Sequence, residues 1–143
     1  MKVAVEKANR VELFAALKQS EARFIPDAEN KVSYLALLSQ YTWVGKVDDQ
    51  IVCAFGVIPP SVLSNTAYLW SFTTDKVEDH KFLFVRYSQR MLERIHVEFP
   101  RIIGHVKPGE TRSIRWLRWL GAVFGDPVEK GIPFVIERKN HGA

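Results

Sequence analysis

The sequence predicts an α+β fold for residues 1–143, a single domain in which strands and helices come in blocks. Residues 42–58 and 67–73 are rich in β-branched and aromatic residues, which favours strands. Residues 78–97 repeat apolar residues at helical spacing, which predicts the longest helix of the chain. A length of 143 residues is enough to bury a substantial core, and a share of 47% hydrophobic residues is ordinary for a globular protein.

The N-terminal part of the chain predicts a short edge strand followed by two helices. Asn9 is expected to cap the first helix and Glu12 to reach back to the cap, as in a capping box. The positions that follow at helical spacing are Val11, Phe14, Ala15 and Lys18. Pro26 and Asp27 break the chain. The second helix is expected over residues 31–40, with an inward face of Val32, Leu35, Ala36 and Leu38.

A hairpin and a third strand are predicted next. Residues 42–47 and 50–58 have the composition of strands, and Asp48-Asp49 between them fits a tight turn. The two prolines that follow end the second strand, because proline has no N–H to donate to a neighbour. Residues 67–73 form the third strand of this block.

The long helix is expected to have two distinct faces. Its buried face should comprise Phe84, Tyr87, Ser88, Met91, Leu92 and Ile95. Its solvent face should comprise Arg86, Arg90, Glu93 and Arg94. Pro100 ends the helix, residues 101–106 form the next strand, and Pro108-Gly109 forms a turn.

Residues 110–122 predict a short helix with one basic face. On an ideal helix one arc holds Ile114, Trp116, Leu117 and Leu120. The other arc holds Arg112, Arg115 and Arg118, with Trp119 between the first two. Gly121 supplies the flexible residue that helix ends favour. Residues 123–124 and 133–137 are expected as closing strands.

Composition excludes several classes of protein. A net charge of +4 suits an anionic ligand such as a nucleotide cofactor, and equally weak contact with nucleic acid. The chain has neither a long apolar run nor the apolar core of a signal peptide, which predicts a protein that stays inside the cell or is packaged without export. Cys53 is the only cysteine and is expected to be an inert core residue. The four histidines lack the spacing of a zinc site.

Residues 110–122 resemble a motif of the GNAT superfamily of N-acetyltransferases, Asn-x-x-Ala-x-x-Leu-Tyr-x-x-Leu-Gly-Phe. Glu110 stands at the Asn, Ser113 at the Ala, Leu117 at the Tyr and Gly121 at the Gly, with no gap. The segment Trp-Leu-Arg-Trp-Leu-Gly is most similar to a divergent branch of this superfamily found in phages, the T7 internal virion protein A family. The resemblance is strongest over residues 102–123.

This resemblance implies an α/β sandwich, a mixed six- to seven-stranded sheet with helices on both faces. It implies that strands 67–73 and 101–106 run parallel and part, and that acetyl-CoA lies where they part. The residues implied in binding the cofactor are Ser71, Phe72, Thr73, Lys76, His80, Lys81, Arg112 and Arg115. The arginines with Trp119 would form a stacking and phosphate platform. The alternative is structural, with the indole packed under the arginine stems.

Two departures from the family pattern bear on catalysis. The phosphate loop of the family reads Gln/Arg-x-x-Gly-x-Gly/Ala, and here Asp79 and Lys81 replace both glycines. The alternative for this segment is an ordinary solvated helix start, with acidic residues at the positive end of the helix dipole. Many GNAT enzymes use the tyrosine of the motif as general acid, and Leu117 has no proton to give. Glu110 replaces the Asn that commonly contacts the cofactor, and its alternative role is to cap the helix.

The sequence leaves two functions open. The first is transfer of acetyl from acetyl-CoA to an amine, with weakened catalysis and with His105, Asp75 and Glu78 as candidate bases. A lone histidine on a strand is more often a structural residue than a catalytic one. The second is a non-catalytic phage protein of GNAT shape, which acts as a virion component or binds a host protein or nucleic acid. The expected location is the host cytoplasm or the virion, with no membrane partner.

Overall fold

A computed structural model describes residues 2–139. The elements follow the predicted order, and their bounds are β1 (Val3–Lys7), α1 (Arg10–Lys18), η1 (Glu21–Phe24), α2 (Ala28–Leu38), β2 (Tyr41–Val47), β3 (Gln50–Ile58), β4 (Thr66–Thr73), η2 (Asp75–His80), α3 (Lys81–Glu98), β5 (Arg101–Val106), α4 (Thr111–Trp119), β6 (Val123–Phe124) and β7 (Ile132–Glu137). The strands form a seven-stranded mixed sheet in the order β1-β2-β3-β4-β5-β7-β6. The predicted α+β class and the mixed sheet are therefore confirmed.

Residue contacts divide the chain into two compact units. Among the described residues, the first unit comprises residues 2–58 and 70–84, and the second comprises residues 59–69 and 85–139. Strand β4 and helix α3 each begin in one unit and end in the other. The expectation of one domain over the whole chain stays a prediction.

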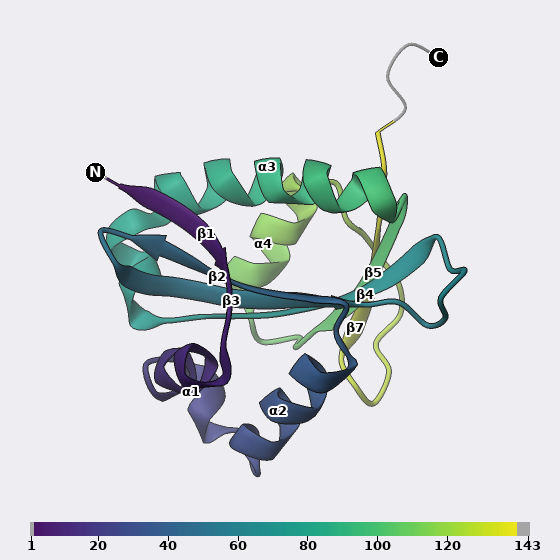
Figure 1. Cartoon of the computed structure of the whole chain (residues 1–143). Helices are drawn as coiled ribbons and strands as arrows, with labels where there is room; N and C mark the ends of the chain where they lie inside the picture. The colour runs from purple at the N-terminus through teal and green to yellow at the C-terminus, as the bar shows by residue number, and fades with distance from the viewer. Residues whose placement is uncertain (1, 140–143) are drawn as a thin grey trace. The chain divides into compact units, whose positions relative to one another are not determined.

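The first unit is built on an antiparallel meander of β1, β2 and β3. The turn between β2 and β3 has positive φ at both Asp48 (49°) and Asp49 (66°), the geometry that matches the twist of a hairpin. Helices α1 and α2 both contact β3 and lie on the same side of it (Figure 1). The buried apolar residues of this unit are Leu13, Ala16, Leu17, Val32, Val44, Val47, Val52, Ala54, Phe55, Val57 and Trp70.

The buried rows of α1 and α2 differ from the helical spacing noted for α1 and from the inward face predicted for α2. In α1 the buried row is Leu13, Ala16 and Leu17, whereas Val11 is 77% exposed. In α2 Val32 is buried as expected, but Leu38 is 45% exposed. Leu38 lies six residues after Val32, which at about 100° per residue turns it far from the face that Val32 sets. The prediction that Leu38 points inward is wrong.

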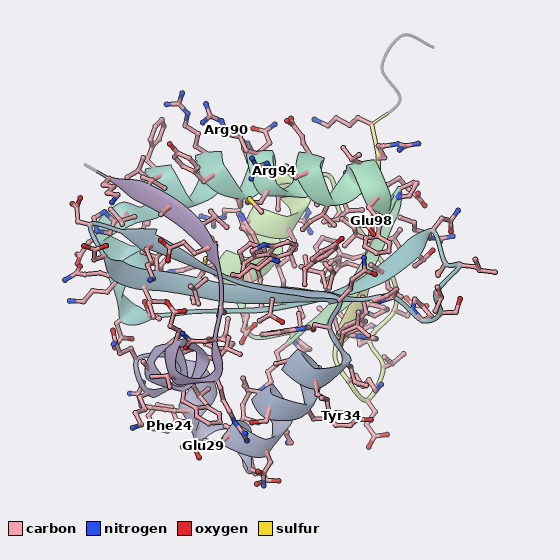
Figure 2. The ribbon with its side chains drawn as sticks, viewed as in Figure 1. Phe24, Glu29, Tyr34, Arg90, Arg94 and Glu98 are labelled. Carbon is pink, nitrogen blue, oxygen red and sulfur yellow. The ribbon has the colours of Figure 1, made fainter. Side chains whose placement is uncertain are left out.

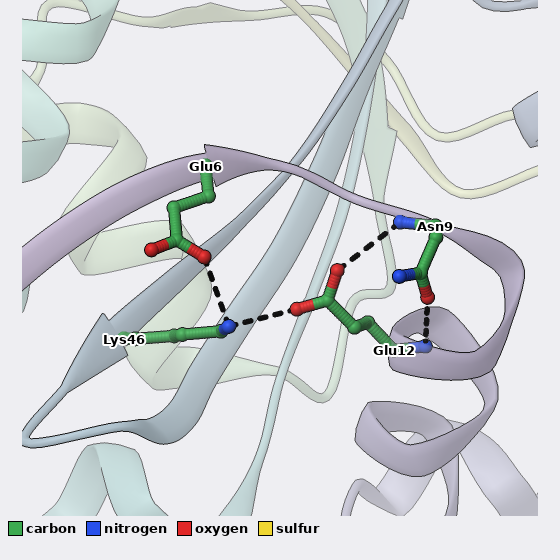
Figure 3. A network of polar contacts seen from close by, with 4 residues as sticks. All are labelled: Glu6, Asn9, Glu12 and Lys46. Carbon is green, nitrogen blue, oxygen red and sulfur yellow. Dashed lines mark hydrogen bonds and ion pairs between the residues drawn. The ribbon is translucent and has the colours of Figure 1, made fainter.

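A lysine joins β1, β2 and α1 (Figure 3). Lys46 Nζ lies 2.9 Å from Glu6 Oε2 and 2.8 Å from Glu12 Oε2. Glu12 also completes the predicted capping box, since its carboxylate accepts from the Asn9 N–H at 3.3 Å while its own N–H donates to Asn9 Oδ1 at 2.8 Å. The hydrogen bond from Lys46 is the largest cause that holds the pKa of Glu12 below its ordinary value.

The Lys46→Met variant is expected to melt at a lower temperature than the parent at neutral pH. Folding lowers the pKa of Glu12. Its ionised carboxylate therefore adds to the free energy of unfolding above the unfolded-state pKa of about 4.3, and this contribution is lost as the pH falls through the folded-state value. The difference in Tm between parent and variant should therefore shrink below about pH 4. Calorimetry at both pH values measures it, with Lys7→Met on the exposed face of β1 as control. A difference that stays constant with pH would contradict the assignment.

The second unit is organised around β5. This strand pairs antiparallel with β7, which in turn pairs with β6. The Trp116 indole N–H of α4 donates to Ser88 Oγ of α3 at 2.9 Å, and His96 Nε2 of α3 lies 3.2 Å from the Ile136 carbonyl oxygen of β7. The buried apolar residues of this unit are Ala67, Leu92, Ile95, Phe99, Ile102, Val106, Leu117, Leu120, Ala122, Phe134 and Ile136.

Helix α3 bears out most of the predicted division into faces. Leu92 and Ile95 are buried, and so is His96, which was not expected there. The other predicted inward residues, Phe84, Tyr87, Ser88 and Met91, are only partly covered. All four predicted solvent residues are exposed, and Arg90 and Arg94 project from the outer face of the helix (Figure 2). None of the helices within residues 2–139 has the length and apolar composition that a bilayer crossing needs.

Helix α4 ends as the sequence predicts. Gly121 has a φ of 97°, which glycine adopts without strain. The Gly121 N–H donates to the Arg118 carbonyl and the Ala122 N–H donates to the Leu117 carbonyl, both at 3.0 Å. This pair of hydrogen bonds is the Schellman motif, and it turns the chain sharply toward β6.

Candidate functional site

The ladder between β4 and β5 is short. Its parallel pairs are Thr66–Arg101, Ala67–Ile102 and Tyr68–Ile103. Strand β4 runs on to Thr73, and β5 runs on to Val106 with its β7 ladder intact. The ladder thus ends at Tyr68 and Ile103, well before either strand does.

The second half of β5 is held from the β7 side. Gly104 pairs with Phe134 in the ladder, and a Cβ atom on this glycine would lie 2.5 Å from the Phe134 ring and 3.0 Å from the Leu69 carbonyl oxygen. The ring therefore occupies the space that a side chain at position 104 would take. Phe134 thus packs over Gly104, the residue that precedes His105.

The structure brings Tyr68 and His105 together at the end of the ladder. The Tyr68 hydroxyl lies 3.2 Å from His105 Nδ1, and the ring centroids are 5.7 Å apart. Tyr68 pairs with Ile103, and His105 follows two residues later, so alternation places both side chains on one face. Burial raises the pKa of the Tyr68 hydroxyl, which keeps it protonated at neutral pH.

Sequence reasoning proposed His105 but missed Tyr68. The register of the two strands would have revealed Tyr68, because it pairs Tyr68 with Ile103 and so places Tyr68 on the same face as His105. Register between parallel strands far apart in the chain cannot be read from either segment alone.

The end of β4 carries three of the predicted cofactor residues. Ser71 and Thr73 are exposed, while Phe72 is partly covered. Trp70, one position earlier, is buried, and its indole N–H donates to Ser39 Oγ at 2.7 Å. The ring of Phe72 lies 6.4 Å from that of Trp70. The strand is thus anchored by Trp70, and its last residues remain accessible.

A buried threonine fixes the turn between β4 and α3. Thr74 is 2% exposed, and its hydroxyl donates to the Ile51 carbonyl at 2.6 Å. The same oxygen accepts from the Lys76 N–H at 3.3 Å and so caps η2. Because η2 is a 3-10 segment, the α-helix begins at Lys81, three residues after the predicted start at Glu78. The predicted start is wrong at this point.

The predicted phosphate residues all lie on η2 or at the first residue of α3. Lys76 and His80 are partly covered, and Lys81 is exposed. Lys81 Nζ forms an ion pair with Glu78 Oε2 at 3.0 Å. The candidate bases Asp75 and Glu78 are exposed on the same segment, in the first unit, whereas His105 belongs to the second.

Helix α4 presents the predicted basic arc. Arg112 and Arg115 are exposed, and the Arg118 guanidinium lies 5.6 Å from the Phe124 ring centroid. Trp119 is 54% exposed, and Leu117 at the tyrosine position of the motif is 4% exposed. Glu110 occupies the N-cap position, but its side chain makes no cap hydrogen bond among the described residues, so its predicted capping role is wrong.

Two further observations concern other kinds of site. Burial raises the pKa of the Cys53 thiol to about 11, as expected for an inert core cysteine. Within residues 2–139, no group of three or more His, Cys, Asp or Glu side chains is placed to hold a metal ion.

The fold, but not the sequence, matches known proteins. No protein-family model and no curated protein matches this chain. A chimera built on the spermidine N-acetyltransferase of Vibrio cholerae superposes with a TM-score of 0.72 and 11% identity, covering 96% of each chain. A Bacillus subtilis acetyltransferase in complex with CoA gives 0.69 and 9%, covering 96% of this chain and 99% of the other.

A third structure is the Escherichia coli N-acetyltransferase of a ribosomal-protein alanine. Its TM-score is 0.67 at 12% identity, with 99% of each chain covered. At these identities the likeness concerns the fold. The phage branch finds no support in these comparisons and stays a prediction. The strand order, the element order and these superpositions together show that this chain has the fold of the GNAT acetyltransferases.

Proposed function

We propose that this chain transfers an acetyl group from acetyl-CoA to an amine. The observation that carries the proposal is the short ladder between β4 and β5, which ends after three residue pairs in a chain with the acetyltransferase fold. Beyond Tyr68, the main chain of β4 can hydrogen-bond an extended ligand in the manner of a further strand. The pantetheine arm of CoA is such a ligand.

The cofactor arm is proposed to run along residues Ser71–Thr73. Ser71 and Thr73 are exposed, and the buried Trp70 holds the strand in place. The pyrophosphate would then lie at η2, next to the side chains of Lys76, His80 and Lys81. Charged side chains replace the backbone N–H groups of a glycine loop, because the Lys76 N–H is already bound by Thr74.

The acceptor is proposed to be a primary amine. Amines are the acceptors named for two of the similar structures, spermidine in one and a ribosomal-protein alanine in the other. The neutral amine would attack the thioester carbonyl directly, which needs a base near the reacting nitrogen. His105 is the strongest candidate, and Asp75 and Glu78 remain candidates to act through water.

Acetyl-CoA is expected to raise the melting temperature of the protein. A ligand present at 100 times its Kd adds about 2.7 kcal/mol to the free energy of unfolding. The double variant Lys76→Ala/Lys81→Ala should lose most of this shift, because it removes two charges next to the proposed phosphate position. Lys130→Ala, at an exposed turn of the second unit, is the control and should keep the shift. Unchanged melting of the parent at millimolar acetyl-CoA would contradict the proposal.

A second function rests on the exposed side chains of α4. Trp119 is 54% exposed on the arc that also carries Arg112 and Arg115, a combination that suits a phosphate chain with stacked bases. Of the alternative roles of a non-catalytic protein, this combination favours nucleic-acid binding. Binding of single-stranded DNA that weakens steeply with salt, without acetyl transfer, would support it. Robust acetyl transfer without DNA binding would remove it.

A further inference from the structure

We infer that Tyr68 and His105 form the proton-transfer pair of this enzyme, with Tyr68 as the acid that protonates the departing thiolate. The inference rests on the proposed acetyl transfer and adds the residues that handle its protons. The motif position on α4 supplies no acid, because Leu117, where the motif has tyrosine, is a buried aliphatic side chain.

The position of the pair along β4 suits the reacting end of the cofactor. If the phosphates lie at η2 and the arm runs back along Thr73 to Ser71, the thioester comes next to the residues just before Ser71. Tyr68 lies three residues earlier, about 10 Å along an extended strand. The ladder with β5 ends at Tyr68. Its partner on β5 is Ile103, and His105 follows two residues later.

The contact between the two rings supports direct proton transfer. The Tyr68 hydroxyl and His105 Nδ1 are 3.2 Å apart, within hydrogen-bond distance. Both side chains are partly covered, and neither is fully buried. Burial favours the protonated form of the Tyr68 hydroxyl, which is the form that an acid needs.

The step conserves atoms and charge. The amine nitrogen bonds to the acetyl carbon, the carbon–sulfur bond breaks, and CoA leaves as the thiolate. The amine gives one proton to His105 Nε2, which starts unprotonated while Nδ1 carries its hydrogen. Tyr68 gives its hydroxyl proton to the thiolate, and His105 Nδ1 then returns a proton to the phenolate across the 3.2 Å contact. The products are the acetylated amine and free CoA.

The test compares two acyl donors that differ in their leaving group. Tyr68→Phe should lower kcat with acetyl-CoA by about 100-fold, the usual effect of losing an acid. With an acetyl thioester of an aryl thiol, whose thiolate leaves without help, the loss should be less than about 10-fold. His105→Gln should lower kcat with both donors alike, because it removes the base. Tyr34→Phe, at an exposed tyrosine of α2, should change neither rate.

Melting curves keep the result interpretable. Tyr68→Phe retains the ring, and it should keep both the parent Tm and the shift caused by acetyl-CoA. Equal losses with both donors, or no loss with acetyl-CoA, would overturn the assignment of Tyr68 while leaving the transfer activity in place. A parent protein that transfers acetyl from neither donor and shows no shift would overturn the proposed function, and this inference with it.

Discussion

The Ile102→Ala variant is expected to lose about 2–5 kcal/mol of unfolding free energy, the usual cost of removing a fully buried isoleucine side chain. Ile102 is 0% exposed and lies in the middle of three strands, paired with Ala67 of β4 on one side and with Ile136 of β7 on the other. Neither neighbour can fill the space, because Ala67 is small and Ile136 is itself fully packed. The cavity would therefore stay open and the loss would fall toward the upper end of that range.

Chemical denaturation and calorimetry measure this loss. For a chain of this size, each kcal/mol corresponds to about 2–4 °C in Tm. Val62→Ala is the matched control, since Val62 is 99% exposed and its truncation should change the free energy by less than about 0.5 kcal/mol. Similar losses in the two variants would show that Ile102 is not part of the core.

The Gly131→Ala variant is expected to lose more than about 2 kcal/mol, because two costs add. The φ of Gly131 is 128°, a conformation that residues with a side chain rarely adopt. A Cβ atom there would also lie 2.7 Å from the Val106 carbonyl oxygen, which is held in the β5–β7 ladder and cannot move freely.

Gly109→Ala provides the control for this substitution. A Cβ atom at Gly109 meets nothing within 4 Å, and its φ lies outside the left-handed region. Alanine there should be neutral or stabilise by about 0.4–1 kcal/mol, because it restricts the unfolded chain. Denaturant titrations of the two variants give both values, and a loss at Gly109 as large as at Gly131 would contradict the role of the glycine conformation.

Local patterns in the chain predicted the order of its strands and α-helices. The two aspartates of the hairpin, the capping box of Asn9 and Glu12, and the helix stop at Gly121 each depend on residues within a few positions of one another. The motif around Gly121 also led to the correct fold. The buried faces of α1 and α2 were harder to predict, because several rows of apolar residues on each helix have the same spacing.

The candidate site shows the same division. Ser71, Phe72, Thr73, Lys76, His80 and Lys81 all lie within residues 71–81, and their role in binding the cofactor stays a prediction. The start of α3 was misplaced, because the 3-10 form of η2 depends on Thr74, whose hydroxyl bonds to Ile51 on another strand. The residues near position 74 in the sequence do not predict that contact.

Short-range chemistry thus accounts for the order of strands and helices, the hairpin turn, the capping box of α1, the end of α4 and its basic arc. The tertiary structure alone decided how distant strands pair. It set which residue of β4 lies opposite which residue of β5, and where their ladder ends. Such pairing depends on the joint burial of Ala67, Ile102 and Ile136 across three strands, so no single segment contains the information. The contact of Tyr68 with His105 is a direct consequence of that register.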